Sequence, residues 1–234
     1  MSIETIFLDA GGVLAFPNWE RVTAILAAHG VEVEPRALGA ADPVAKLQID
    51  AGSYVGASTD GERWHRYFEL VFAAAGIRPD SRVDAAIDAI RAYHNIHNLW
   101  ETVPDEVRPA LVRLRKLGLC LAVVSNANGT VADAFERVGL SEYVDMIIDS
   151  HYEGIEKPDP RLFQIALERA GAQADMTVHL GDLFHVDVLG ARAAGIRAVL
   201  LDPAGLYHEY DCQRVGSLTE FVDRLEAATF GPIA

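Results

Sequence analysis

Short apolar runs alternate with helix-periodic segments over the second half of the chain. In the helical segments, apolar residues recur every three or four positions, and a glycine stands close to each helix end. This alternation predicts helices at 106–117, 131–138, 160–170 and 188–194, and strands at 119–124, 146–148, 178–180 and 198–201. Strands that alternate with helices form parallel sheets covered on both faces, so the pattern predicts an α/β fold.

The first hundred residues follow a different pattern. An apolar run at 5–8 predicts one strand, whereas residues from about 18 to 98 show helical spacing and no convincing strand. The spacing is clearest at Trp19, Val22, Ile25 and Leu26, and at Trp64, Tyr67, Phe68, Val71 and Phe72. The simplest assembly places the first strand in the sheet. It predicts a Rossmann-like core domain of residues 1–15 plus 99–234, and an all-helical cap domain of residues 16–98 above the carboxyl ends of the strands.

Composition and charge narrow the range of functions. Half of the 234 residues are hydrophobic, which is enough for a full core, and the formal net charge is −14. Such a charge repels nucleic acid and anionic lipid, so we expect neither as a partner, and an anionic substrate would need a local cation. No apolar run approaches the roughly 18 residues of a membrane span, and no leader pattern is found, so we expect a cytoplasmic protein. Cys120 and Cys212 lack metal-ligand spacing and are expected to be free thiols in a reducing compartment.

Reactive side chains stand where the predicted strands end or in the loops nearby. They are Asp9, Ser125-Asn126, Lys157, Asp182 and Asp187. In open α/β sheets, ligands bind in the crevice outside the carboxyl ends of the strands, so these residues predict a functional site there. Taken singly, each segment also has an ordinary interpretation, as a turn aspartate, a helix cap or a solvated lysine.

Together, these segments resemble the four motifs of the haloacid dehalogenase-like hydrolase superfamily. The motifs are Asp9-Ala10-Gly11-Gly12-Val13-Leu14, Ser125-Asn126, Lys157-Pro158-Asp159-Pro160 and Gly181-Asp182-x-x-x-x-Asp187. They occur in the order of the family, at or near strand ends, and the resemblance spans about two thirds of the chain. It implies a phosphatase-type hydrolase with a Rossmann-like core and a helical cap inserted after the first motif.

The resemblance also implies a role for each residue. Asp9 would be the nucleophile that attacks phosphorus, while Ser125 would donate a hydrogen bond and Lys157 would neutralise charge in the transition state. A Mg²⁺ ion would offset the repulsion between the carboxylate and the phosphate. The residues implied to hold the metal are Asp9, Gly11 through its carbonyl, Asp182 and Asp187, the last through a coordinated water or by holding Lys157. The residues implied to bind the substrate are Gly12, Asn126 and Ala127, the last two through their backbone amides.

One residue departs from the family pattern. Most phosphatases of the family carry a second aspartate two residues after the nucleophile, as general acid and base, and here that residue is Gly11. General acid–base catalysis contributes about 10²–10⁴ in rate, so we expect slow turnover or a restriction to good leaving groups. Candidate substitutes for the missing carboxylate are His65, His94, His97 and His185. The last motif also departs from its common form, at Leu183 and Val186.

Two other functions remain open from the sequence. A 2-haloacid dehalogenase would use the same nucleophile without a metal, but such enzymes usually lose the acid pair that is retained here as Asp182 and Asp187. A catalytically silent protein on the same fold would bind a phosphorylated ligand without turnover. We favour the hydrolysis of a small phosphorylated metabolite, by a monomer or a homodimer. Candidate contacts to the rest of this substrate are the cap residues Trp64, His65, Arg66 and Tyr67.

Overall fold

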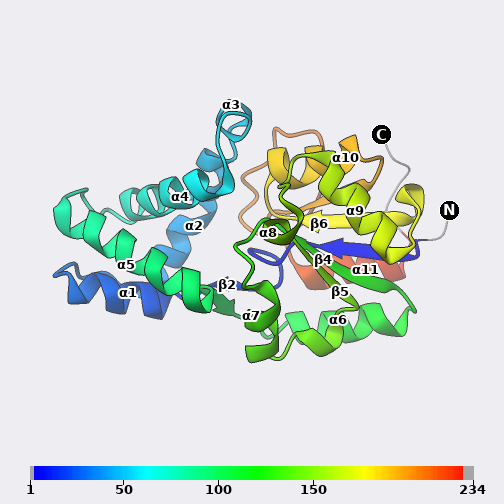
Figure 1. Ribbon diagram of the computed structural model, residues 1–234, viewed down its shortest axis with the longest axis horizontal. Helices are drawn as coiled ribbons and strands as arrows, with labels where there is room; N and C mark the ends of the chain where they lie inside the picture. Colours follow the sequence, from blue (N-terminus) through cyan, green and yellow to red (C-terminus); the bar gives the residue numbers. More distant parts are fainter. Residues whose placement is uncertain (1–2, 229–234) are drawn as a thin grey trace.

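A six-stranded parallel sheet forms the centre of the structure (Figure 1). The computed structural model describes residues 3–228. The strands follow the spatial order β5-β4-β1-β6-β7-β8, with β1 between β4 and β6. Their bounds are β1 Thr5–Leu8, β4 Cys120–Ser125, β5 Met146–Asp149, β6 Thr177–Gly181, β7 Arg197–Leu201 and β8 Gln213–Val215. This sheet confirms the predicted α/β fold, and because its strands are parallel, their carboxyl ends meet at one edge.

Helices cover both faces of the sheet. On one face Ile6 and Leu8 belong to a hydrophobic cluster with α6 and α11, and on the other face Phe7 belongs to a cluster with α9 and α10. Successive residues of β1 point to opposite faces and both faces are buried, which explains the continuous apolar run. The helices of this part are α6 Val107–Lys116, α7 Val131–Arg137, α8 Ser150–Glu153, α9 Pro160–Ala170, α10 Leu189–Ala193 and α11 Leu218–Glu226.

A second group of helices lies between β1 and β4 in the sequence, and Figure 1 shows it beside the sheet, on the left. These helices are α1 Trp19–Ala28, α2 Pro35–Ile49, α3 Gly52–Val55, α4 Asp60–Ala74 and α5 Ser81–His97. Their apolar faces form a hydrophobic cluster of their own, with Leu26, Phe68 and Ile87 at 0–1% exposure. We call residues 19–97 the helical segment. That it is a separate domain, with boundaries at 15/16 and 98/99, stays a prediction.

Two short strands join the helical segment to the rest of the protein. β2 Phe16–Pro17 pairs antiparallel with β3 Trp100–Thr102, so the chain leaves and returns at one place. Polar contacts also tie the segment to the sheet region. Asp50 accepts the amides of Phe184 and His185 at 2.6 and 2.9 Å, and the carbonyl of His97 accepts a hydrogen bond from Nη2 of Arg137. Further contacts of this kind involve Lys46 and Glu156, which are described below.

The predicted helices and strands agree with the observed ones to within one residue at each end. The apolar pattern does not predict β2, β3, β8 or α11. β8 is a strand of three residues, and Gln213 and Arg214 are only half-buried, so it lacks an apolar run. The turn of π-helix η3 Phe184–Val188, which precedes α10, is also not predicted. Among residues 3–228, no helix combines the length and apolarity that a membrane crossing requires, and both cysteines are free.

Candidate active site

The four motif segments converge at the carboxyl edge of the sheet, around the side chain of Lys157. Its Nζ lies 2.7 Å from Oδ1 of Asp9 and 2.6 Å from Oδ1 of Asp187, and the lysine is only 1% exposed. Although burial alone would lower the pKa of Lys157, the carboxylates of Asp187 and Asp9 raise it above its ordinary value. Lys157 is therefore a fixed ammonium that orients the Asp9 carboxylate.

Asp187 holds this ammonium, and its own position is fixed on both oxygens. Oδ2 accepts the amides of Asp182 and Leu183 at 3.2 and 3.0 Å, and Oδ1 contacts Nε2 of the buried His179 at 3.1 Å. Burial lowers the pKa of His179, so its neutral ring can donate to the carboxylate. Although burial would raise the pKa of Asp187, Lys157 and His179 hold it well below its ordinary value. Asp187 thus contacts Lys157, while the two roles expected for it, holding this lysine or a coordinated water, stay predictions.

The carboxylates of Asp9, Asp182 and Asp187 form a group that fits a divalent cation. Each offers one oxygen, these oxygens lie within 4.8 Å of one another, and all three residues are buried. Burial raises the pKa of Asp9 to about 7 and also raises that of Asp182, because charged carboxylates are poorly solvated there. Carboxylate oxygens are the ligands that suit a hard cation such as Mg²⁺. Gly11, the further predicted metal ligand, lines the same cavity.

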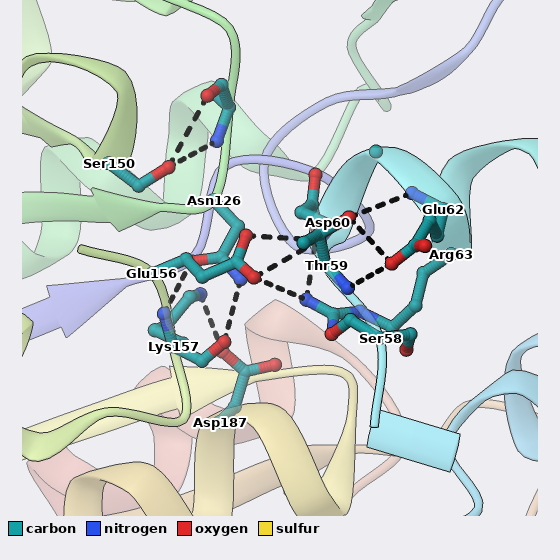
Figure 2. Close-up of polar contacts among 12 residues, drawn as sticks. Ser58, Thr59, Asp60, Glu62, Arg63, Asn126, Ser150, Glu156, Lys157 and Asp187 are labelled. Atoms are coloured by element: carbon teal, nitrogen blue, oxygen red, sulfur yellow. Dashed lines mark hydrogen bonds and ion pairs between the residues drawn. The ribbon is translucent and has the colours of Figure 1, made fainter. Parts of the chain in front are cut away.

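Asn126 positions Lys157 through the backbone. The Lys157 amide donates to Oδ1 of Asn126 at 2.7 Å, and Nδ2 of Asn126 donates to the Lys157 carbonyl at 2.9 Å (Figure 2). This reciprocal pair joins the end of β4 to the loop before α9. These two hydrogen bonds are made by the side chain of Asn126, whereas the family resemblance implied a role for its backbone amide.

The two other residues that are expected to bind the substrate, Gly12 and Ala127, also lie at this edge. The amide of Ala127 donates to Oγ of Ser150 at 3.0 Å, so a phosphoryl oxygen would have to compete with that hydroxyl. Gly12 has a φ of +81°, and a Cβ there would lie 1.9 Å from Oδ2 of Asp182. Gly12 is therefore needed for the close approach of Asp182. Ser125 ends β4 and lines the cavity described next.

A cavity of about 430 Å³ lies over this group of residues. Asp9, Ser125 and Lys157 line one side, and aromatic residues of the helical segment and β3 line another, which gives it the size of a small-molecule site. The aromatic lining residues include Trp64, Tyr67 and Trp100. Of the four predicted substrate contacts, Trp64 and Tyr67 line the cavity. His65 and Arg66 are not among its lining residues and instead approach Glu69.

The four candidate substitutes for the missing carboxylate are not equivalent. Only His94 lines the cavity, and its Nδ1 accepts the amide of Leu99 at 3.1 Å. Burial, helped by Arg91, lowers the pKa of His94 to about 4, so it is neutral and cannot be a cationic acid near pH 7. His97 contacts the ring of Tyr93. His185 lies 3.6 Å from Asp50 and does not line the cavity.

The residues at the site that the sequence did not predict include Lys46, Glu156 and His179. Lys46 of α2 contacts Asp182, with Nζ 2.8 Å from Oδ2. Glu156 accepts the amide of Asp60, the first residue of α4, at 3.0 and 3.2 Å (Figure 2). The third is His179, described above. Sequence reasoning missed them because each acts through a tertiary contact. The composition could have drawn attention to Lys46, because it is one of only three lysines in the chain.

Comparisons with known proteins agree with this geometry. The haloacid dehalogenase-like hydrolase family matches residues 3–195. In Bos taurus, haloacid dehalogenase-like hydrolase domain-containing protein 3 is 33% identical over 215 residues, which cover 86% of this chain and 85% of that protein. Glyceraldehyde 3-phosphate phosphatase of Methanopyrus kandleri is 29% identical over 168 residues, which cover 70% of each protein.

A solved structure shares the fold. The putative HAD-hydrolase YfnB from Bacillus subtilis, bound to magnesium, aligns with a TM-score of 0.70 at 16% identity, over 97% of this chain and 100% of that one. At this identity the likeness shows the fold alone. The family match, by contrast, spans most of the chain and includes every motif residue around Lys157. The chain therefore belongs to the haloacid dehalogenase-like hydrolases.

Proposed function

We propose that this hydrolase cleaves small phosphate monoesters with the help of Mg²⁺, through an aspartyl-phosphate formed on Asp9. The observation that carries the proposal is the contact of the Lys157 ammonium with both Asp9 and Asp187, beside Asp182, at the end of a cavity. A carboxylate held by a buried ammonium is oriented for attack and keeps little freedom to turn away.

In the first step, an oxygen of Asp9 forms a bond to phosphorus while the bond from phosphorus to the ester oxygen breaks. In the second step, water attacks the phosphoryl group, and the Asp9 carboxylate is released with inorganic phosphate. Asp9, Asp182 and Asp187 would hold Mg²⁺, which when bound offsets the repulsion between carboxylate and phosphate. Lys157 and the hydroxyl of Ser125 would stabilise the phosphoryl oxygens as negative charge builds up on them.

Departure of the ester oxygen is not assisted by a carboxylic acid at residue 11. Gly11 has no side chain, and the neutral His94 can offer only a hydrogen bond. The proposal therefore includes a preference for esters whose leaving groups need no protonation.

The relatives support a small substrate. One similar protein is a glyceraldehyde 3-phosphate phosphatase by name, and the cavity of about 430 Å³ is of a size that suits a metabolite and not a macromolecule. We extend this substrate class to the present chain, with no nucleic acid or membrane partner. Its location in the cytoplasm stays a prediction.

The experiment measures phosphate release from 4-nitrophenyl phosphate and from a panel of sugar phosphates, with Mg²⁺ and with a chelator. We expect turnover that requires both Mg²⁺ and Asp9, and none from a folded Asp9→Asn variant. A 2-haloacid is tested in parallel. Halide release that is insensitive to the chelator would overturn the proposal in favour of a dehalogenase. Phosphate binding without any turnover would overturn it in favour of a silent binding protein.

A further inference from the structure

Lys46 brings a second ammonium into the carboxylate group from outside the sheet. It lies on α2 of the helical segment, and its side chain is 15% exposed. Nζ lies 2.8 Å from Oδ2 of Asp182 and 3.2 Å from Oδ2 of Asp42, which is one turn earlier on the same helix. The ammonium is therefore shared between a residue proposed to bind the metal and a residue of its own helix.

The position of this ammonium is built by the surrounding residues. Asp42 is buried and accepts a hydrogen bond from the hydroxyl of Tyr67 on α4, so two helices fix its carboxylate. The ring centroid of Phe16 lies 5.5 Å from Nζ of Lys46. Below the ion pair, a Cβ at Gly12 would lie 1.9 Å from Oδ2 of Asp182 and 2.7 Å from Nζ of Lys46. Because Gly12 has no Cβ, Lys46 and Asp182 have room to form their ion pair.

Lys46 and a divalent cation would attract the same carboxylate. Asp182 is one of three residues whose oxygens lie close enough to share a cation, and one of its oxygens is in contact with an ammonium. An ammonium at this distance weakens the pull of Asp182 on any second cation. If Asp182 is given up to a metal, Lys46 still has Asp42 as a partner, so no unpaired charge is left buried.

From these contacts we propose that the ammonium of Lys46 competes with the metal for Asp182. When a divalent cation binds, this ammonium moves from Asp182 towards Asp42. Because Lys46 belongs to the helical segment, cation binding also removes a polar contact between that segment and the sheet region. The inference rests on the magnesium site of the proposed function.

The test measures the affinity for Mg²⁺ directly, by isothermal titration calorimetry on the full chain. Lys46→Met removes the competitor and is expected to tighten Mg²⁺ binding by about tenfold, within the usual range of coupling between sites. Asp42→Asn removes the charge that receives Lys46, so the ammonium holds Asp182 more firmly, and the affinity is expected to fall by about fivefold. Lys116→Met, at an exposed lysine on α6, should bind as the wild type does.

A second readout uses the unaltered protein and does not depend on the folding of a variant. The chain has three lysines, so labelling with an amine reagent followed by mass spectrometry can report Lys46 against the exposed Lys116. We expect Mg²⁺ to increase the labelling of Lys46 relative to that of Lys116, and we expect Asp182→Asn to increase it without Mg²⁺.

Opposite signs for the two variants distinguish competition from a structural role. If Lys46→Met and Asp42→Asn both weaken Mg²⁺ binding, or if Mg²⁺ leaves the labelling of Lys46 unchanged, the inference is wrong. Equal affinities in all proteins, together with Mg²⁺-dependent turnover, would overturn this inference alone. No binding of Mg²⁺ by any of them would overturn the proposed metal site as well.

Discussion

The indole of Trp100 lies against Gly11, with Cδ1 and Nε1 each 3.1 Å from the position that a Cβ of residue 11 would take. This distance is shorter than a comfortable contact, so the indole would have to shift for any side chain at residue 11. Trp100 itself is held by aromatic contacts with Tyr67, Phe68 and His94. The absence of a carboxylate at residue 11 is therefore matched by the packing around it.

The first prediction concerns this contact. Gly11→Asp should lower the free energy of unfolding by about 1–3 kcal/mol through overpacking, and should not raise kcat/KM. Adding Trp100→Phe gives the carboxylate space, so the double variant should hydrolyse aryl phosphates with a weaker dependence on the pKa of the leaving group. The measurement is kcat/KM over a series of aryl phosphates. A Gly11→Asp single variant that already loses this dependence would contradict the prediction.

A second prediction tests how Lys157 is positioned. Asn126→Ala removes both hydrogen bonds to the Lys157 backbone, so kcat should fall about 10- to 100-fold while KM changes little. Asn128→Ala is the matched control, because Asn128 also lines the cavity but bonds to the hydroxyl of Thr130. Steady-state kinetics of both variants decide the matter. An equal loss in the two would show that cavity shape matters and the Lys157 contact does not.

The fold could be predicted largely because the strands of this sheet are buried on both faces. Phe7 and Leu8 are apolar although they face different helices, and the same holds for Ala122 and Val123, so each strand appears as a continuous run. The apolar runs do not predict the order of the strands, because burial on both faces does not decide which strands are neighbours. The last strand escaped prediction because Gln213 and Arg214 are held at the edge by pairing with β7, which leaves no mark on the pattern.

A third prediction concerns pH. Because the pKa of His94 is lowered to about 4 in the folded protein and is about 6.5 when unfolded, the unfolded chain binds the extra proton between these values. The contribution of His94 to the free energy of unfolding is complete above about pH 6.5. It falls as the pH drops towards 4, by at most about 3 kcal/mol. His94→Gln should remove this part of the pH dependence.

The measurement is urea unfolding of the wild type and of His94→Gln between pH 4 and 8. The wild type should lose its advantage over the variant as the pH falls. A difference between the two proteins that stays constant with pH would contradict the prediction, since other titrating groups are common to both.

A fourth prediction concerns the contact between Glu156 and α4. Glu156→Gln weakens the acceptor at the first turn of α4 and should cost about 1 kcal/mol, with faster hydrogen exchange both at residues 60–63 and in the loop 154–157. The control is Glu62→Gln, which affects the capping box with Thr59 at the same helix end but touches only the helical segment. The control should loosen residues 60–63 alone. Protection in the loop that is unchanged by Glu156→Gln would contradict the prediction.

The candidate site divides into a predictable and an unpredictable part. Asp9 and Asp182 directly follow parallel strands and Ser125 ends one, so their meeting at one edge follows from the topology. The contacts that these residues make with side chains from other elements do not follow from the topology. Lys46 reaches Asp182 from α2, and Trp100 covers Gly11 from β3, so both depend on how the helical segment sits on the sheet region. The side-chain role of Asn126 likewise depends on a loop about thirty residues further along the chain.

Glu156 and Lys157 are adjacent in the chain, but their side chains contact different parts of the protein. The side chain of Glu156 contacts α4, and that of Lys157 contacts Asp187 (Figure 2). Lys157 also contacts Asp9. A single peptide bond therefore links the contact of Glu156 with α4 to the contact of Lys157 with Asp9, the proposed nucleophile. A displacement of α4 would therefore reach the backbone of Lys157 through one peptide bond, which makes the position of the ammonium sensitive to that of the helical segment.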